Sequence, residues 1–263
     1  MNKAFDMTGK VFIVTGSGKG IGKGIVRCFV KSGAKCCINC NSNAAMAQET
    51  LKEIQAIGGP DCAFVYQADV SDYAQAEAMV KATYERYGRI DGLVNNAALQ
   101  KQLQLDEYTL EDYDLLMHVN LGGYINMMRA TLPYLKETRG SITCISSVHG
   151  KRPTHFDPVY AMTKGGMHML MREAAIEFAK YGVRVNMIMP AGVKIEFKSG
   201  NPRPFTKPRL QPPREYMKKY PTYPLGRLGL PDDDGWACVY LASEEAEHVT
   251  GACLRVDGGC VLL

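Results

Sequence analysis

The chain has 263 residues, of which 46% are hydrophobic and 22% charged, and its formal net charge is +4. This composition is globular and allows one large core, so a single domain spanning 1–263 is expected. No apolar run approaches the roughly 20 residues of a membrane-spanning helix, and the opening residues MNKAFDMTGK lack the apolar stretch of a secretory signal. A cytoplasmic protein with no membrane partner is therefore predicted.

Strand-like and helix-like segments alternate along the chain. Short apolar runs predict strands at 10–14, 34–39, 62–70, 92–96, 141–146, 183–189 and 252–256. Segments with helical periodicity lie between them, for example 43–58 and 73–88. Repeated β-α-β units of this kind predict an α/β fold, a doubly wound parallel sheet of about seven strands with helices on both faces. Such sheets bind ligands at the carboxyl edge, where the strand order reverses.

The nine cysteines are odd in number and scattered, which suits a reducing compartment better than a disulfide framework. Cys37 and Cys40 have the spacing of a metal clip or a redox pair. Both fall in a predicted strand, however, where positions three apart point to opposite faces. The two thiols are therefore expected not to meet, and no metal site is predicted.

The first predicted strand leads into a glycine-rich loop, VTGSGKGIGKG at 14–24, which opens a helix. A glycine turn between a strand and a helix places backbone N–H groups and the helix N-terminus where they can hold a pyrophosphate. In the pattern T-G-x-x-x-G-x-G, Gly16 is predicted to make the tight turn, Gly20 to let the backbone approach the phosphates, and Gly22 to let the helix pack closely. A flexible connection between a strand and a helix would have the same composition, so the loop alone does not establish that the chain binds a nucleotide.

The charges beyond this loop bear on the choice of dinucleotide. NAD sites usually place an acidic residue at the end of the second strand, about 20 residues on, to bind the ribose hydroxyl. No acidic residue occurs between Asp6 and Glu49, and the predicted strand end reads Cys40-Asn41-Ser42. The interval instead holds Lys10, Lys19, Lys23, Arg27, Lys31 and Lys35. A 2′-phosphate would find donors there and no repelling carboxylate, so NADP(H) is predicted over NAD(H), with Lys19 as the contact residue.

A tyrosine and a lysine in the segment YAMTK carry the predicted chemistry. Tyr160 and Lys164 are four residues apart, so on a helix they lie on one face. A nearby cation favours the phenolate and would lower a tyrosine pKa of roughly 10, which lets the pair serve as general acid and base. Ser147 directly follows the strand 141–146, where its hydroxyl could hold a carbonyl oxygen.

Over essentially its whole length the chain resembles the short-chain dehydrogenase/reductase family, which has a single-domain Rossmann fold. The matching motifs are T-G-x-x-x-G-x-G at 15–22, ADV with Asp69, NNA at 95–97, HVN ending at Asn120, ISS ending at Ser147, YAMTK at 160–164, MP at 189–190 and VDGG at 256–259. The resemblance implies an oxidoreductase in which Tyr160 exchanges a proton with the substrate oxygen. Lys164 would hydrogen-bond the nicotinamide ribose, Ser147 would orient the substrate, and Asn120 would anchor a water.

The resemblance also implies a cofactor site. Its predicted members are Gly16, Ser17, Lys19, Gly20, Ile21, Gly22, Asn41, Ser42, Asp69, Val70, Asn96, Ala97, Ala98, Tyr160, Lys164, Pro190 and Val193. Members of the family usually read N-N-A-G and P-G-x-[IV]-x-T, whereas this chain has Ala98, Ala191 and Ile195. Ile195 lacks the hydroxyl that normally contacts the cofactor, so that hydrogen bond is lost or supplied by a neighbour.

The segment 194–224 occupies the family's variable substrate lid and holds seven of the thirteen prolines. Residues 194–219 carry eight basic and two acidic side chains, a local charge of +6. This charge could steer an anionic substrate, or simply face water. Other predicted pocket residues, besides Ser147 and Tyr160, are Gln100, His149 and His155.

The favoured function is an NADP(H)-dependent oxidoreductase acting on a secondary alcohol or ketone. Segments such as SSVHG and NPRPF are similar to bacterial glucose 1-dehydrogenase-like members, and hydroxysteroid dehydrogenases and 3-oxoacyl reductases share the framework. The alternative is a catalytically silent, dinucleotide-sensing binding protein. No nucleic-acid partner is predicted, because the basic residues form no helix stripe with interleaved aromatics. A homotetramer or dimer is expected from the resemblance and from the many apolar residues of helix 166–179.

Overall fold

The computed structural model describes residues 4–153, 157–195 and 223–262. The strands are β1 (Val11–Val14), β2 (Lys35–Cys40), β3 (Ala63–Gln67), β4 (Gly92–Asn95), β5 (Ser141–Ile145), β6 (Arg184–Pro190) and β7 (Cys253–Val256). The longer helices are α1 (Gly20–Lys31), α2 (Ala44–Gly58), α3 (Tyr73–Tyr87), α4 (Leu110–Met117), α5 (Gly123–Thr138), α6 (Pro158–Ala179) and α8 (Pro231–Ala242). Short turns of helix include η2 (His118–Gly122), a π-helix, and η3 (Val148–Gly150).

The described strands form one parallel, seven-stranded sheet in the order β3-β2-β1-β4-β5-β6-β7. The strand order reverses between β1 and β4, which is where such a sheet opens a crevice at its carboxyl edge. The predicted doubly wound α/β sheet is therefore confirmed. The largest difference from the predicted ranges is in β3, which ends at Gln67 and not at residue 70, because Asp69 forms a turn in which its carboxylate accepts from the N–H of Ser71 at 2.9 Å.

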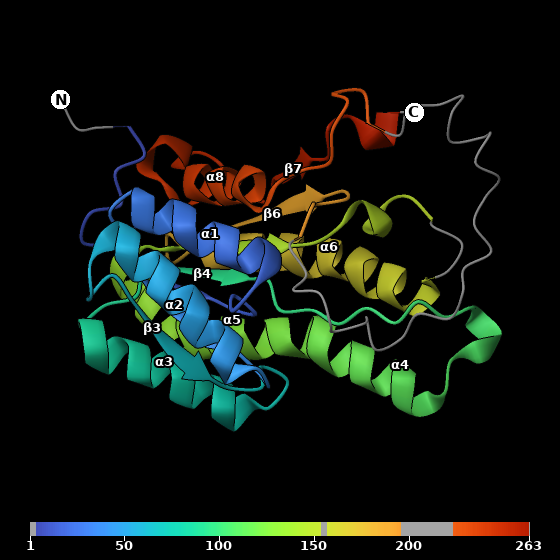
Figure 1. Ribbon diagram of the computed structural model, residues 1–263, viewed down its shortest axis with the longest axis horizontal. Helices are drawn as coiled ribbons and strands as arrows, with labels where there is room; N and C mark the ends of the chain where they lie inside the picture. The colour runs from blue at the N-terminus through green and yellow to red at the C-terminus, as the bar shows by residue number, and fades with distance from the viewer. Residues whose placement is uncertain (1–3, 154–156, 196–222, 263) are drawn as a thin grey trace.

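Two clusters of buried apolar side chains fill the space between the sheet and the helices on its two faces. One cluster joins α1, α2 and α8 to one face of the sheet, and the other joins α3, α5 and α6 to the opposite face. Figure 1 shows these two sets of helices on either side of the strands. Cys37 belongs to one cluster and Cys40 to the other, so the prediction that these thiols point to opposite faces is confirmed. All nine cysteines are free thiols.

The contact between α1 and α8 explains a glycine to which the sequence assigned no role. A Cβ atom added at Gly24 would lie 2.4 Å from the side chain of Pro231, at the start of α8. Contacts that short do not occur between real side chains, so only glycine permits this approach of the two helices. The packing fixes α1, whose N-terminus opens toward the carboxyl edge of the sheet.

Candidate active site

A cavity of about 560 Å³ lies at the carboxyl edge of the sheet, beside the point where the strand order reverses. The predicted residues that line it are Gly16, Lys19, Gly20, Ile21, Asn41, Asp69, Val70, Asn96, Ala97, Ala98, Gln100, Ser147, Tyr160, Lys164 and Pro190. Those that do not line it are Ser17, Gly22, Ser42, Asn120, His149 and Val193. Sequence motifs separated by up to 174 positions, from Gly16 to Pro190, thus converge on one cavity.

The glycine loop is held in place by side chains of neighbouring strands. Gly16 has φ +60°, and a Cβ there would lie 2.8 Å from the Cα of Ala97, so this tight turn requires glycine. Asn96 donates its amide to the carbonyls of Thr15 and Gly16 at 2.8 and 3.1 Å. The Thr15 hydroxyl in turn accepts from the backbone N–H groups of Asn96 and Ala97. The loop is therefore fixed before any ligand binds.

Asn39 is a member of the cavity wall that the sequence reasoning missed. Its amide oxygen accepts from the N–H of Gly16 at 2.9 Å, and its amide nitrogen donates to the carbonyl of Ala68 at 3.0 Å. The sequence did contain a signal for it: Asn39 is a lone polar residue inside an otherwise apolar strand. A buried side-chain amide needs hydrogen-bond partners, so such a residue indicates a structural contact. Asn39 joins the glycine turn to the segment that carries Asp69.

Several predicted cofactor residues lie behind the cavity wall. Ser17 is buried; its hydroxyl donates to the carbonyl of Val14 at 2.6 Å and accepts from the N–H of Asn39 at 3.1 Å. A Cβ at Gly22 would lie 2.7 Å from the Gly16 carbonyl, so Gly22 lets α1 pack against the loop. Ser42 is exposed, and Val193 forms a bridge with Gly229. Ser17 and Gly22 thus shape the loop from behind.

Helix α6 brings the predicted catalytic residues together. Tyr160 and Lys164 lie one turn apart, with the Lys164 ammonium 5.5 Å from the centre of the Tyr160 ring. Lys164 is only 1% exposed and donates to the carbonyl of Ile145 at 2.8 Å. The side chain of Ser147 is close enough to the Tyr160 phenol to lower its pKa. The hydroxyl, the phenol and the ammonium therefore share one wall of the cavity.

Burial controls the protonation of this pair. It raises the pKa of Tyr160 above its ordinary range, as does the nearby charge of Asp157, while the hydrogen bond with Ser147 acts in the opposite direction. Burial also lowers the pKa of Lys164 to about 7. The sequence predicted a lowered tyrosine pKa, and in this structure the direction is the reverse. The reason is that burial disfavours the charged phenolate itself, and this effect is larger than the opposing effect of the hydrogen bond with Ser147.

Asn120 lies in the π-helix η2 and is fully buried. Its side chain bonds to the backbone N–H and carbonyl of Leu99 at 2.8 and 2.9 Å and donates to the hydroxyl of Thr163 at 3.2 Å. It therefore connects the loop after β4 to helix α6. The predicted role in anchoring a water stays a prediction.

The predicted substrate-side residues occupy different positions. Gln100 lines the cavity, and its amide donates to the carboxylate of Asp157. His149 is set back, with its ring edge-on to that of Tyr160 at 5.7 Å between centres. Its backbone N–H donates to the Ser147 hydroxyl at 3.2 Å. His155 and nearly all of the basic lid lie outside the described residues.

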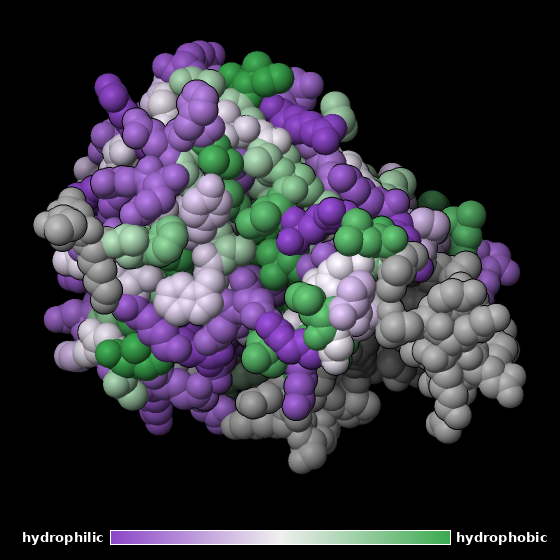
Figure 2. All heavy atoms as spheres, turned by 90° about the horizontal axis from the view of Figure 1, so that it is seen from above, coloured by the Kyte–Doolittle hydropathy of each residue, from purple (hydrophilic) through white to green (hydrophobic). Residues whose placement is uncertain are grey.

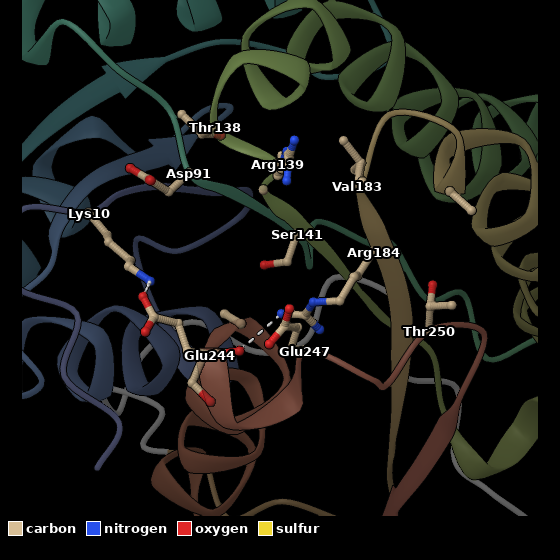
Figure 3. A pocket seen from close by; sticks show the side chains of 15 residues that line it. Lys10, Asp91, Thr138, Arg139, Ser141, Val183, Arg184, Glu244, Glu247 and Thr250 are labelled. Carbon is tan, nitrogen blue, oxygen red and sulfur yellow. Dashed lines mark hydrogen bonds and ion pairs between the residues drawn. The ribbon is translucent and has the colours of Figure 1, made fainter. Parts of the chain in front are cut away.

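A second cavity, of about 470 Å³, lies at the amino edge of the sheet, around Ser141 and Arg184 (Figure 3). Lys10 pairs there with Glu244 at 3.1 Å. The Arg184 guanidinium donates to the carbonyls of Leu241, Ser243 and Val249. These charges tie strand β6 to the end of α8, and none of the residues of the catalytic motif lies there.

The residues around the first cavity fit a nicotinamide dinucleotide. No side chain caps the N-terminus of α1, and its first turn carries no acidic residue, so its N–H groups remain available to an anion. Among the described residues there is no group of three potential metal ligands. The described helices also include none long and apolar enough to cross a membrane.

Comparison with known proteins agrees with this geometry. Residues 16–261 match the family model described as enoyl-(acyl carrier protein) reductase. The chain belongs to the short-chain dehydrogenase/reductase family, and it is an oxidoreductase by fold and relationship.

Three relatives illustrate the range of the family. Glucose 1-dehydrogenase 2 of Bacillus subtilis is 34% identical over 98% of this chain and 96% of its own length. The 3beta-hydroxysteroid dehydrogenase 1 of Eggerthella lenta is 34% identical over 98% of this chain and 95% of its own length. The structure of a 3-ketoacyl-(acyl-carrier-protein) reductase from Brucella melitensis, complexed with NADH, superposes with a TM-score of 0.83 at 31% identity. The match covers 97% of this chain and 99% of the reductase chain.

Proposed function

We propose that this chain is an NADP(H)-dependent oxidoreductase that interconverts a secondary alcohol and a ketone. The observation that carries the proposal is the convergence of Ser147, Tyr160 and Lys164 on the same cavity as the glycine loop. Oxidation of NADPH with a panel of sugars, steroids and β-keto esters tests it. A sugar or polyol, a hydroxysteroid and a 3-oxoacyl compound remain the candidate substrates, as the relatives' names also cover these classes.

Each residue has a separate task in the proposed reaction. A bound nicotinamide dinucleotide supplies or accepts the hydride. Tyr160 gives a proton to the substrate oxygen in the reductive direction and takes it back in the oxidative one. Ser147 holds that oxygen within reach of the phenol, and Lys164 holds the ribose and favours the phenolate. The phenol of Tyr160, whose pKa lies above the ordinary value of roughly 10, is protonated at neutral pH, which is the form that donates.

The preference for NADP(H) rests on Lys19. Lys19 is exposed at the mouth of the cavity and has no ion-pair partner among the described residues. Its neighbours in sequence are paired: Lys23 with Glu53, and both Arg27 and Lys31 with Asp232. A 2′-phosphate would therefore find at Lys19 a cation that no carboxylate of the described residues neutralises.

Reversal of this charge gives a direct test. We expect kcat/KM with NADPH to exceed that with NADH at least about tenfold, equivalent to about 1.4 kcal/mol, and Lys19→Glu to abolish or invert the ratio. Lys23→Glu makes the same change one turn along α1, outside the cavity, and is expected to keep the ratio. Equal efficiency with both cofactors in the unmodified protein would contradict the proposal.

A catalytically silent dinucleotide sensor is the alternative function. It would need the same glycine loop but no proton donor beside a substrate. The close placement of Ser147, Tyr160 and Lys164 favours an enzyme, because a sensor gains nothing from a buried lysine, which costs free energy to desolvate.

The proposed organisation is one domain, 1–263, in which 194–224 forms the substrate lid. We further propose that it acts in the cytoplasm, and the nine free thiols are compatible with that reducing compartment.

We also propose a homotetramer. On α6 the outward-facing side chains of Met169 and Ile176 are 55% and 75% exposed, although the inward face of the same helix is buried. Trp236 on α8 and Leu254 on β7 are exposed as well. Figure 2, which views the molecule from the α8 side, shows hydrophobic patches among hydrophilic groups. Apolar surface on two separate faces is what two contacts per subunit would cover.

Light scattering tests the assembly. We expect a mass near four times the 29.0 kDa of one chain. Ile176→Glu places a charge on the proposed α6 contact and is expected to yield a smaller species. Ile57→Glu, on α2, alters an exposed isoleucine outside both contacts and is expected to leave the mass unchanged. A stable monomer of the unmodified protein at micromolar concentration would refute the tetramer.

A further inference from the structure

A buried carboxylate lies beside the catalytic tyrosine, at a position that sequence reasoning did not single out. Asp157 immediately precedes α6, three residues before Tyr160, and is 1% exposed. Its side chain does not cap the helix. Carboxylates are seldom fully buried, because removal from water is costly unless specific partners compensate for it. Its position therefore invites a functional explanation.

One of its partners reaches into the cavity. The side-chain amide of Gln100 donates to the Asp157 carboxylate, and Gln100 is also part of the cavity wall. An ionised carboxylate only accepts hydrogen bonds, so it orients the NH₂ group of Gln100 toward itself. The carbonyl oxygen of the same amide is left with no hydrogen-bond donor among the described residues. The cavity wall therefore carries an oriented acceptor at Gln100.

The charge of Asp157 affects the pKa of two neighbouring phenols. Burial is the larger cause of the raised pKa of Tyr108 and of Tyr160, and in both cases the negative charge of Asp157 adds to it. A negative charge that opposes the Tyr160 phenolate also opposes an anionic group on a substrate beside it, since Asp157 is itself buried and water screens a buried charge poorly.

We propose that Gln100, oriented by Asp157, determines substrate specificity by selecting neutral substrates with a second hydroxyl group and disfavouring anionic ones. Gln100 accepts a hydrogen bond from the hydroxyl that does not react, and Asp157 is a positioning residue that acts through Gln100 and through its charge. Gln100 is exposed in the free protein, where water can reach its carbonyl oxygen. A bound substrate without the second hydroxyl would displace that water and leave the carbonyl unpaired, which is how a site built around a hydrogen bond discriminates against such an analogue. The inference rests on the proposed function and narrows its substrate class to polyols and hydroxylated rings. This inference argues against the anionic substrate that the basic segment 194–219 suggested.

The test compares three probes of one ring size: trans-cyclohexane-1,2-diol, cyclohexanol and 2-hydroxycyclohexanecarboxylate. We expect kcat/KM for the diol to exceed that for cyclohexanol at least about tenfold, mostly through KM, and Gln100→Leu to reduce the ratio to near unity. Asp157→Asn keeps the shape and removes the charge, and is expected to raise kcat/KM for the carboxylate at least about tenfold. Gln104→Leu and Asp106→Asn make the same changes at exposed residues outside the cavity. They are expected to change neither the ratio of diol to cyclohexanol nor kcat/KM for the carboxylate.

Binding measured by calorimetry in a Tyr160→Phe background separates this inference from the proposed function, because it requires no turnover. Preferential binding of the diol that disappears with Gln100→Leu supports the inference even if the unmodified protein oxidises none of the probes, an outcome that would count against the proposed function. Equal turnover of diol and cyclohexanol would support the function and overturn the inference. Failure to bind the diol, or a diol preference unchanged by Gln100→Leu, would overturn the inference as well.

Discussion

Replacing Tyr160 with phenylalanine is expected to lower turnover at least about 100-fold, the low end of what a positioned acid–base group contributes. The substitution removes the transferable proton and keeps the ring, which packs edge-on against His149. Folding and NADPH binding are therefore expected to persist. Steady-state kinetics, together with fluorescence titration of NADPH, separate the loss of chemistry from a loss of binding.

Tyr113→Phe is the matched control. Tyr113 is on the neighbouring helix α4, is 39% exposed and does not line the cavity. Its hydroxyl is expected to be dispensable for turnover. A Tyr160→Phe protein with near-normal kcat on its true substrate would mean that another group transfers the proton, and the role assigned to Tyr160 would be wrong.

Replacing Asp234 with leucine is expected to stabilise the protein by several kcal/mol at pH 8. Asp234, in the first turns of α8, is 0% exposed, and neither carboxylate oxygen has a hydrogen-bond partner among the described residues. Burial, with a smaller contribution from Asp233, raises the pKa of Asp234 from 3.8 to about 8. At about 1.4 kcal/mol per unit of pKa, ionisation of this carboxyl in the folded state costs on the order of 5 kcal/mol. Leucine has a similar branched shape and no charge.

The sign of the pH dependence follows from the same shift. Between about pH 4 and pH 8 the folded chain keeps a proton on Asp234 that the unfolded chain releases. This group therefore makes the free energy of unfolding fall as the pH rises through that window, and its effect levels off above the folded pKa. Asp234→Leu is expected to remove this slope.

Urea unfolding at several pH values measures this prediction. Asp61→Leu, the same change at an exposed aspartate, is the control and is expected to leave both the slope and the free energy of unfolding nearly unchanged. A strongly destabilised Asp234→Leu variant would show that the carboxyl makes a favourable interaction, and the cost assigned to its burial would be wrong.

Much of the fold and the centre of the site were predictable because they depend on local patterns. Alternating apolar strands and periodic helices predicted the sheet, and parallel strands place their carboxyl ends at one edge. That geometry is why Ser147 after β5 and the glycine loop after β1 were expected to meet. Helical spacing alone placed Tyr160 beside Lys164.

The features that sequence reasoning missed depend on contacts between distant segments. The bond between Gln100 and Asp157 spans 57 residues, and that between Asn39 and Gly16 spans 23. No local period encodes such pairs. The raised pKa of Tyr160 was missed for a related reason, because the spacing to Lys164 is visible in the sequence and the burial of both groups is not.

The central claim is that this chain moves a hydride between NADPH and a carbonyl carbon with Tyr160 as the proton donor. The most direct measurement uses NADPH deuterated at the transferable position, incubated with the protein and the panel of sugars, steroids and β-keto esters, with products analysed by mass spectrometry. We expect one deuterium at the carbinol carbon of at least one product, and at least about 100-fold slower labelling with Tyr160→Phe. Saturable NADPH binding without transfer of label to any panel member would contradict the claim and favour the dinucleotide sensor.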